Sequence, residues 1–487
     1  MRIVSDRCSA NSTSRASEIL AIALLSTLKA ASPPFNYKKC STCWTSWVWR
    51  RLFGRRRQGC HERILNSLRP DRLEVFCGGE KVGAVFDCDL LTFEYEPAWL
   101  SASNRIQLAA IPLQVGRQSG PLISAFFENL LPEGELRDYL AAQRKASSLF
   151  SLLLEVAGDT AGAFVLLAPG EDPKPPTYEA TTWEAIATRI SKRSAAAIDI
   201  RGQGARISLA GAQDKTGIAL FEDGIPRLPR GTSPSSHILK PNIRRLAMVW
   251  HSSANETIVM RAASLAGLPT AEVFYESRTE SCLVRRFDRK PGPDGTLERL
   301  VQYDLCQLAG VQSDRKYEKE GGPSLAACSE LIRRHSVQPA VDLLQLVRWV
   351  FFNLYVGNHD SHAKNLSMYY LPGKGMRMTP FYDLMSTRLY AGLSPEFAFA
   401  IGGETRPGQM VSRHLKQLAT ELGMHPRFIT QQAEFMAART PGAISLAVSQ
   451  IGASLAPSAA TLADRLQRFV ASSTHKQLAR FLSAPTA

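Results

Sequence analysis

The sequence predicts an α+β protein that contains more than one domain. Three features of its 487 residues lead to this prediction. Short apolar runs bounded by turn residues occur in both halves of the chain, as expected for strands. Longer runs with helical spacing dominate the second half, and a Pro- and Gly-rich stretch at 169–182 separates the two parts. We expect a small N-terminal α+β domain at 71–170, a linker at 171–195 and a larger domain at 196–475.

The composition is that of a soluble globular protein. Hydrophobic residues make up 45% of the chain and charged residues 21%, which is close to the average for such proteins. No apolar run reaches the roughly 18 residues that a membrane-spanning helix needs, so we expect no membrane association. Nine cysteines, an odd number without regular spacing, favour free thiols in a reducing cytoplasm. We therefore expect a cytoplasmic protein.

Residues 1–70 form a basic leader without the pattern of a packed domain. The first 62 residues hold 11 Lys or Arg against 3 Asp or Glu, which accounts for more than half of the net charge of +14. Three tryptophans are interleaved with arginines there, so the stretch could contact nucleic acid or an acidic membrane surface. Periodic patterning begins only near Leu73. We therefore expect a disordered or mis-started leader that belongs to no domain.

The small domain alternates strand and helix patterns. "LEVFCGGEKVGAVF" predicts two strands joined by a turn at Gly78–Gly79. "PLISAFFENLLPEGELRDYLA" predicts a helix with Phe126, Leu130 and Leu131 on one face. "LFSLLLEVAGDTAGAFVLLAP" predicts a helix, a Gly-Asp turn and a further strand. These elements together predict the small α+β domain.

The polar stretch "VGNHDSHAKNLS" (356–367) directly follows a strongly apolar segment. Apolar residues recur in that segment at helical spacing, which predicts a buried helix; they are Leu343, Leu344, Leu346, Val347, Val350, Phe351 and Leu354. Gly357 should end the helix. The stretch is either a polar helix end that meets solvent or a functional loop held by a rigid helix.

The spacing of Asp360 and Asn365 favours a functional loop. It matches the D-x-x-x-x-N pattern of the protein-kinase catalytic loop, in which the Asp accepts the proton of the substrate hydroxyl and the Asn binds magnesium. Asp383, eighteen residues beyond Asn365 in "MTPFYDLMS", could supply a second magnesium ligand. Alternatively, Asp383 could cap the N-terminus of a helix. The histidines His359 and His362 favour hydrogen-bonding roles, because Mg²⁺ prefers oxygen ligands.

Two upstream segments could bind the phosphates of a nucleotide. Lys240 ends the apolar strand pattern of "SSHILKPN", and Glu256 opens a helix pattern sixteen residues later, as the paired Lys and Glu of kinases do. "RISLAGAQDKTGIALF" predicts a turn between two apolar strands, where small residues let backbone N–H groups approach phosphate oxygens. Its polar and small residues are Ser208, Gly211, Gln213 and Lys215.

Taken together, these segments resemble HipA-type serine/threonine kinases, the toxin halves of bacterial toxin–antitoxin pairs. The segments that carry the resemblance occur in the family's order; they are "RISLAGAQDKTGIAL", "SSHILKPN", "NETIVMRAASLAGLP", "RRFDR", "QYDLCQLAG", "KYEKEGGP", "GNHDSHAKN" and "PFYDLMS". The resemblance covers roughly residues 73–440. It implies a HipA N-terminal domain followed by a bilobal protein-kinase-like domain, with an N-lobe at about 196–290 and a mainly helical C-lobe at about 291–475.

The resemblance also implies roles for individual residues. Asp360 is implied as the catalytic base with Lys364 beside it in the same loop, and Asn365 and Asp383 as the magnesium ligands. Val284–Phe287 is implied as the hinge against adenine, although the family often has a glutamate at the position of Arg285. The implied ATP site comprises Ser208, Gly211, Gln213, Lys215, Lys240, Glu256, Arg285, Phe287 and His362.

Regulation and partners are implied in the same way. Ser208 matches the serine that such kinases phosphorylate on themselves, which silences the enzyme, and Lys316–Pro323 resembles a mobile loop over the substrate. The implied target is a protein hydroxyl, with aminoacyl-tRNA synthetases among the family's targets. A HipB-like helix-turn-helix antitoxin, operator DNA reached through it, and a homodimer within the complex are the implied partners.

Two other functions stay open at this point. The chain could act mainly as a co-repressor or scaffold bound to an antitoxin on DNA, with catalysis secondary or lost. It could also be a small-molecule kinase of the same fold, because the loop spacing does not specify the acceptor. A small-molecule kinase would not modify itself at Ser208.

Overall fold

The computed structural model describes residues 70–103, 105–131, 148–156, 158–191, 215–244, 246–292 and 296–483. The chain divides into two compact units, Met1–Arg69 and Pro70–Ala487, and all of these ranges belong to the second unit. The predicted leader at 1–70 lies outside the described residues except for Pro70. Within the described part of the chain, no helix is both long and apolar enough to cross a bilayer.

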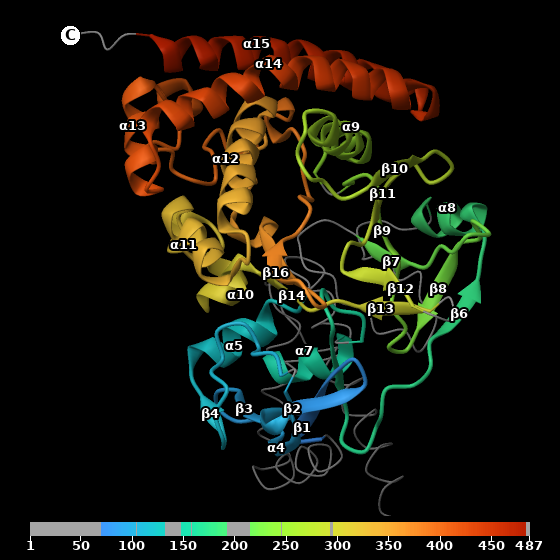
Figure 1. Cartoon of the computed structure of the whole chain (residues 1–487). Coiled ribbons are helices and arrows are strands. Elements are labelled where there is room, and N and C mark those ends of the chain that lie inside the picture. Colours follow the sequence, from blue (N-terminus) through green and yellow to red (C-terminus); the bar gives the residue numbers. More distant parts are fainter. Residues whose placement is uncertain are drawn as a thin grey trace, which may run out of the picture. The chain divides into compact units, whose positions relative to one another are not determined.

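The N-terminal part of the second unit is built on a five-stranded antiparallel sheet, at the blue end of the colour scale in Figure 1. Its strand order is β4-β3-β2-β1-β5; the bounds are β1 Arg72–Cys77, β2 Glu80–Phe86, β3 Thr92–Tyr95, β4 Gln118–Ser119 and β5 Phe164–Leu167. Its helices are α4 Pro97–Ser101, α5 Pro121–Glu128 and α7 Leu149–Val156.

The predicted elements of this part are present. Gly78 and Gly79 form the β1–β2 turn with φ of +58° and +87°, a backbone conformation that glycine adopts without strain. Phe126 is buried as predicted and packs edge-to-face on Phe127 and Phe164, with ring centroids 5.1 and 5.7 Å apart. The helix α5 ends at Glu128, earlier than the apolar pattern indicated, so the buried Leu130 follows it in a turn.

The middle of the chain forms a second antiparallel sheet of order β10-β11-β9-β7 beside helix α9 Ser252–Leu265. The strands are β7 Thr216–Ile218, β9 His237–Lys240, β10 Val273–Glu276 and β11 Ser281–Arg285. β6 Thr177–Ala180 pairs with β8 Arg227–Arg230, and α8 Trp183–Ser191 shares a small core with β9 and β11 through Ile186. Much of the predicted linker at 171–195 thus consists of regular elements, β6 and α8. The domain boundaries themselves stay predictions.

The rest of the chain is mainly helical. Its helices are α10 Leu305–Ala309, α11 Leu325–His335, α12 Pro339–Val356, α13 Ser412–Glu421, α14 Pro426–Ile451 and α15 Ala460–Leu482. Its strands are β12 Arg289–Pro291, β13 Leu297–Arg299, β14 Gln302–Asp304, β15 Ser367–Leu371 and β16 Gly375–Met378. Figure 1 shows α14 and α15 side by side, and α14 also contacts α9 and α12. This arrangement confirms the predicted α+β class with its helical C-terminal region.

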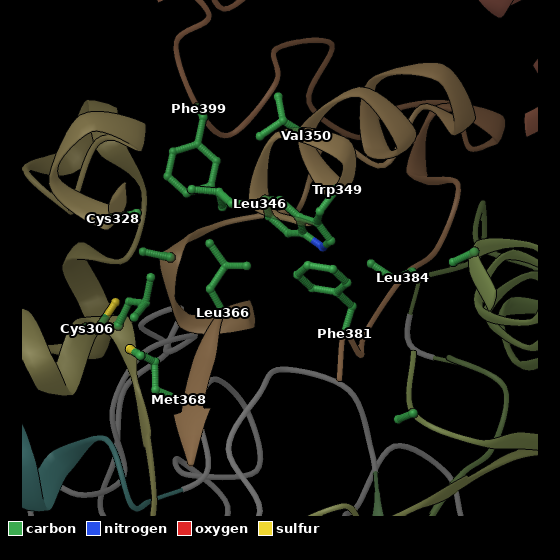
Figure 2. Packing of buried hydrophobic residues seen from close by; sticks show 14 of the residues in the cluster. Cys306, Cys328, Leu346, Trp349, Val350, Leu366, Met368, Phe381, Leu384 and Phe399 are labelled. Atoms are coloured by element: carbon green, nitrogen blue, oxygen red, sulfur yellow. The ribbon is translucent and has the colours of Figure 1, made fainter. Parts of the chain in front are cut away.

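The predicted buried helix is α12, and it anchors the two loops that carry the predicted catalytic residues. Gly357 ends α12 in the left-handed conformation at φ +68°, the usual helix C-terminus for glycine. Figure 2 shows the buried side chains around it; they include Leu346, Trp349, Val350, Leu366, Phe381, Leu384 and Phe399. The rings of Trp349 and Phe381 stack with centroids 5.8 Å apart. Because Leu366 follows Asn365 and Phe381 precedes Asp383, one core supports both loops.

This packing makes Phe381 important for stability. We expect Phe381→Ala to lower the free energy of unfolding by about 3–5 kcal/mol, because it leaves a cavity beside Trp349. Phe274→Ala is the matched control, since Phe274 lies on β10 with 45% of its side chain surface exposed; it should cost less than about 1 kcal/mol. Urea denaturation measures both values. Equal losses for the two variants would contradict the described core.

A buried ion cluster joins the N-terminal part to the second sheet. Its members, here called the Asp159 cluster, are Asp159, Arg286, Asp288, Arg289 and Arg299. The carboxylate of Asp159 lies 2.9 Å from Arg289, 2.8 Å from Arg299 and 3.3 Å from Arg286. The three guanidiniums also donate to backbone carbonyl groups, including that of Thr160. Since Arg286 belongs to the predicted hinge, this cluster fixes the hinge to the N-terminal part.

Candidate active site

A cavity of about 500 Å³ opens between the second sheet and the helical region. The predicted site residues that line it are Lys215, Lys240, Arg285, Phe287, Asp360, His362, Lys364, Asn365 and Asp383. Glu256 does not line the cavity but contacts Lys240 from behind. Ser208, Gly211 and Gln213 lie outside the described residues. The structure therefore gathers into one cavity groups that are up to 168 residues apart in the sequence, Lys215 and Asp383.

Lys240 links the sheet to the helical region. Its ammonium donates to Glu256 Oε1 at 2.5 Å and to Asp383 Oδ1 at 2.8 Å. Lys240 is the last residue of β9, where it pairs with Cys282 of the neighbouring strand β11, and Glu256 lies in the first turns of α9. Both side chains are buried. This is the predicted lysine–glutamate pair, with a third charged group added.

The charges in this group stabilise each other. Burial alone would raise the pKa of Asp383, but the positive charges of Lys240 and Lys215 outweigh it and hold that pKa well below its usual value. Burial alone would lower the pKa of Lys240, but Asp383 and Glu256 raise it above its usual value. For Glu256, burial is the larger effect and raises the pKa despite Lys240. The cavity thus presents an ammonium next to an ionised carboxylate.

Asp383 is held by the backbone on both sides. Its own φ is +61°, an uncommon conformation that Asp tolerates better than most residues. Before it, the Phe381 N–H donates to Pro269 O at 2.7 Å and the Phe381 carbonyl accepts from Ala271 N at 2.9 Å, both beyond the end of α9. After it, Ser386 is the N-cap of the next short helix, η4 Thr387–Leu389. The cap position belongs to Ser386, so the alternative in which Asp383 caps a helix does not hold.

The loop between α12 and β15 places Asp360 at the cavity. Its carboxylate is 57% exposed and accepts a hydrogen bond from the Tyr317 hydroxyl, while His362 Nε2 lies 4.0 Å away. Asn365 donates its side-chain N–H to the carbonyl of Asp360 at 3.0 Å. This bond closes the loop and leaves the Asn365 amide oxygen as its ligand-type atom. The cavity therefore combines a carboxylate that accepts a hydrogen bond from a hydroxyl with oxygen groups suited to Mg²⁺.

Lys364 faces the N-terminal part of the chain. Its ammonium donates to the backbone and side-chain oxygens of Asn129 at 3.1 and 2.5 Å and to Asp304 at 3.1 Å. Neither partner was predicted as a site residue. Asp304 lies in the segment "QYDLCQLAG", which belonged to the resemblance but carried no role. Asn129 lies in "PLISAFFENLLPEGELRDYLA", which resembles the family's N-terminal domain but likewise carried no role.

The predicted hinge forms an apolar wall. Phe287 packs on Tyr382 with ring centroids 5.6 Å apart, and Val284 and Ile238 line the cavity beside it. The amide N–H groups of Arg285 and Arg286 already donate to Glu272 and Ser236, both at 2.9 Å. Backbone recognition of a base would therefore depend on the other groups of Val284–Phe287. The Arg285 side chain pairs with Glu272 at the surface.

The segment Lys316–Pro323 lies over the same cavity. The Tyr317 ring meets His362 edge-on with centroids 5.0 Å apart, and Lys319 pairs with Glu396 at 3.4 Å. Lys316, Tyr317, Lys319 and Glu320 all line the cavity. The segment that the resemblance identified as a loop over the substrate thus contributes to the wall near Asp360.

The residues present fit a magnesium ion that is shared with phosphates. No cluster of three or more His, Cys, Asp or Glu side chains that could hold a metal occurs among the described residues. Mg²⁺ typically binds one or two carboxylates together with substrate phosphates instead of a complete protein cage. The ionised carboxylate of Asp383 and the amide oxygen of Asn365 match this requirement.

A strand lysine paired with a helix glutamate, an Asp-x-x-x-x-Asn loop and a further aspartate at one cavity define a protein-kinase-like enzyme. Family models agree: the "HipA-like C-terminal domain" matches residues 207–444 and the "HipA N-terminal domain" matches residues 73–167. The chain belongs to the HipA family of serine/threonine kinase toxins, which confirms the predicted family, and as a kinase it uses ATP.

Curated relatives and a solved structure support this assignment. "Putative kinase Y4mE" of Sinorhizobium fredii is 38% identical over 343 residues, covering 68% of this chain and 80% of the relative. "Serine/threonine-protein kinase toxin HipA" of Shewanella oneidensis is 31% identical over 408 residues, covering 78% and 90%. The Shewanella oneidensis complex of HipA, HipB and operator DNA aligns with a TM-score of 0.70 at 28% identity, over 84% of this chain and 96% of that one.

Proposed function

We propose that the chain transfers the γ-phosphoryl group of ATP to a protein serine or threonine hydroxyl in this cavity, with Mg²⁺, and limits itself by phosphorylating Ser208. The observation that carries the proposal is the ammonium of Lys240, bonded to both Glu256 and Asp383 at a cavity that also holds Asp360. These are the charged groups that phosphoryl transfer requires.

Each group has a chemical task in this proposal. Lys240 contacts the ATP phosphates, and Glu256 keeps its ammonium in place. Asn365 and Asp383 hold the magnesium ion, which would neutralise phosphate charge when bound. Asp360 accepts the proton of the attacking hydroxyl; its bond from the Tyr317 hydroxyl supports this role, because the carboxylate is within reach of a hydroxyl donor. His362 and Lys364 hold the loop.

Self-limitation at Ser208 follows from charge. Lys215, seven residues after Ser208, lines the cavity, which supports a phosphate-binding role for the segment that includes Gly211 and Gln213. A phosphoserine adds about −1.5 to −2 charges. Such a charge next to this segment would repel the phosphates of ATP, so phosphorylation of Ser208 would stop nucleotide binding.

The partners are proposed from the relatives. The structural neighbour was solved as HipA with HipB and operator DNA, which supports a HipB-like antitoxin and contact with operator DNA through it, with a homodimer inside that complex. An aminoacyl-tRNA synthetase is the proposed protein target. An activity that uses ATP beside DNA would take place in the cytoplasm.

Incubation of the purified full-length chain with magnesium and labelled ATP tests this function. We expect label on Ser208 in the wild type, none at that position in Ser208→Ala, and none anywhere after magnesium is removed with EDTA. Label on a small molecule with none on protein would favour a metabolite kinase. ATP binding without any transfer would favour the scaffold function, and absence of ATP binding would contradict the assignment of the site.

A further inference from the structure

We propose that Asn129 of the N-terminal domain is a positioning residue of the kinase site. It holds Lys364, and through Lys364 it fixes both proposed magnesium ligands. The N-terminal domain is then a working part of the active site. This inference rests on the proposed function and adds a residue and a task to it.

Asn129 accepts two hydrogen bonds from the Lys364 ammonium, one at its backbone oxygen and one at its side-chain oxygen. A lysine has three N–H donors, and the Lys364 ammonium donates to Asn129 O, Asn129 Oδ1 and Asp304 Oδ2. All three residues are at least nine-tenths buried. A buried ammonium is stable only when its hydrogen bonds are satisfied. Two of these three bonds come from Asn129, 235 residues away in the sequence.

The orientation of Asn129 is fixed independently of Lys364. Its side-chain N–H groups donate to Ala125 O at 2.8 Å and to Val311 O at 2.9 Å, so its amide oxygen faces the ammonium. Asn129 is also the C-cap of α5. Carbonyl groups at a helix C-terminus lack helical partners and favour a cation, which the Lys364 ammonium supplies.

The end of α5 also contacts the segment that leads to Tyr317. Glu128, the residue before Asn129, accepts hydrogen bonds from Ser313 N at 2.9 Å and Ser313 Oγ at 3.0 Å. Ser313 begins the turn that leads to Tyr317. The end of α5 therefore contacts two segments that border the cavity. One is the loop that contains Lys364, and the other is the segment that leads from Ser313 to Tyr317.

The position of Lys364 determines where both proposed magnesium ligands lie. Asn365 follows it directly in the short helix η3 Ala363–Asn365. The carbonyl of Lys364 accepts a hydrogen bond from the Tyr382 hydroxyl at 3.0 Å, and Tyr382 precedes Asp383. A displaced Lys364 would therefore move the oxygen groups of Asn365 and Asp383 relative to each other.

The test compares Asn129→Ala with Gln477→Ala. Gln477 is also a buried amide and lies on α15, outside the lining of the cavity. Its side-chain N–H donates to Met410 O at 3.0 Å. Transfer from Mg-ATP to casein gives kcat and KM, and calorimetry of ADP binding with and without Mg²⁺ gives a readout independent of turnover. Thermal unfolding of each variant shows how much stability it loses.

For Asn129→Ala we expect kcat to fall by about 10–100-fold, the usual effect of losing a residue that orients metal ligands. The gain in ADP affinity on adding Mg²⁺ should fall as well, because the two proposed magnesium ligands are no longer held in place. Gln477→Ala should keep wild-type kcat and Mg²⁺ dependence. If Asn129→Ala does not fold, Asn129→Ser is used instead, because the serine side chain is too short for its hydroxyl to reach Lys364. Its kcat and the Mg²⁺ dependence of its ADP affinity are then measured.

Two outcomes overturn the inference and are distinguishable. If the wild type transfers phosphate and the Asn129 variant matches Gln477→Ala in kcat and in Mg²⁺ dependence, Asn129 is structural only. If the wild type itself transfers no phosphate to casein or to Ser208, the proposed function fails, and the positioning role fails with it.

Discussion

Replacing Asp360 with Asn should lower the rate of phosphoryl transfer by about 10²–10⁴-fold, the usual contribution of a general base. The side chain is 57% exposed at the cavity, and Asn preserves its size and the oxygen that accepts from Tyr317. An amide cannot take up the proton of a substrate hydroxyl. The thermal unfolding midpoint and the affinity for ATP should therefore stay near the wild-type values.

The rate is best measured in a single turnover with labelled ATP, so that product release does not mask the chemical step. Asp464→Asn is the matched control, because Asp464 is an exposed carboxylate on α15 outside the cavity. It should transfer at the wild-type rate. An Asp360→Asn enzyme that keeps more than about a tenth of the wild-type rate would remove Asp360 from the role of base.

Asp159→Asn should lower the free energy of unfolding by about 3–5 kcal/mol, because it leaves a buried charge uncompensated. Arg286 and Arg289 would then share the carboxylate of Asp288, and Arg299 would lose the carboxylate that it pairs with. Urea denaturation measures the loss. Asp223→Asn removes the partner of Arg227 at the surface and should leave stability nearly unchanged, since exposed ion pairs contribute little. Similar small losses of stability for both variants would show that Asp159 is not needed to compensate the buried arginines.

The same cluster predicts a response to acid. Burial alone would raise the pKa of Asp288, but Arg286 and Arg289 lower it from 3.8 to about 2. Arg286, Arg299 and Arg289 likewise outweigh burial and lower the pKa of Asp159. The unfolded chain thus binds these protons more readily, so the stabilisation is complete above about pH 5 and is lost as pH falls toward 2. Asp159→Asn should lose less stability than the wild type between pH 5 and about pH 3.

The parts of the site that the sequence predicted are those set by local patterning. The buried spacing of Leu343–Leu354 and the following Gly357 predicted α12 and its end, and the apolar run before Lys240 predicted β9. The five-residue spacing of Asp360 and Asn365 predicted a functional loop directly after α12. In each case, the helix or strand and the residue that follows it are neighbours in the chain, so periodicity and spacing were sufficient.

The parts that the sequence missed depend on contacts between distant residues. Nothing near Asn129 indicates that it faces Lys364, 235 residues later. Nor does "RRFDR" reveal that Asp159 is the partner of its Arg286 and Arg289. The segment 171–195 shows another limit. Its three prolines correctly indicate an irregular start, but the pairing of β6 with β8 is fixed by the partner strand, which no local pattern specifies.

We expect Mg-ATP to occupy the cavity between the second sheet and the helical region. A crystal structure of the full chain with Mg²⁺ and a non-hydrolysable ATP analogue tests it most directly. We predict adenine against Val284–Phe287, phosphates at Lys240, and Mg²⁺ bound by Asn365 and Asp383. A nucleotide bound elsewhere, or a magnesium ion that contacts neither Asn365 nor Asp383, would contradict the account.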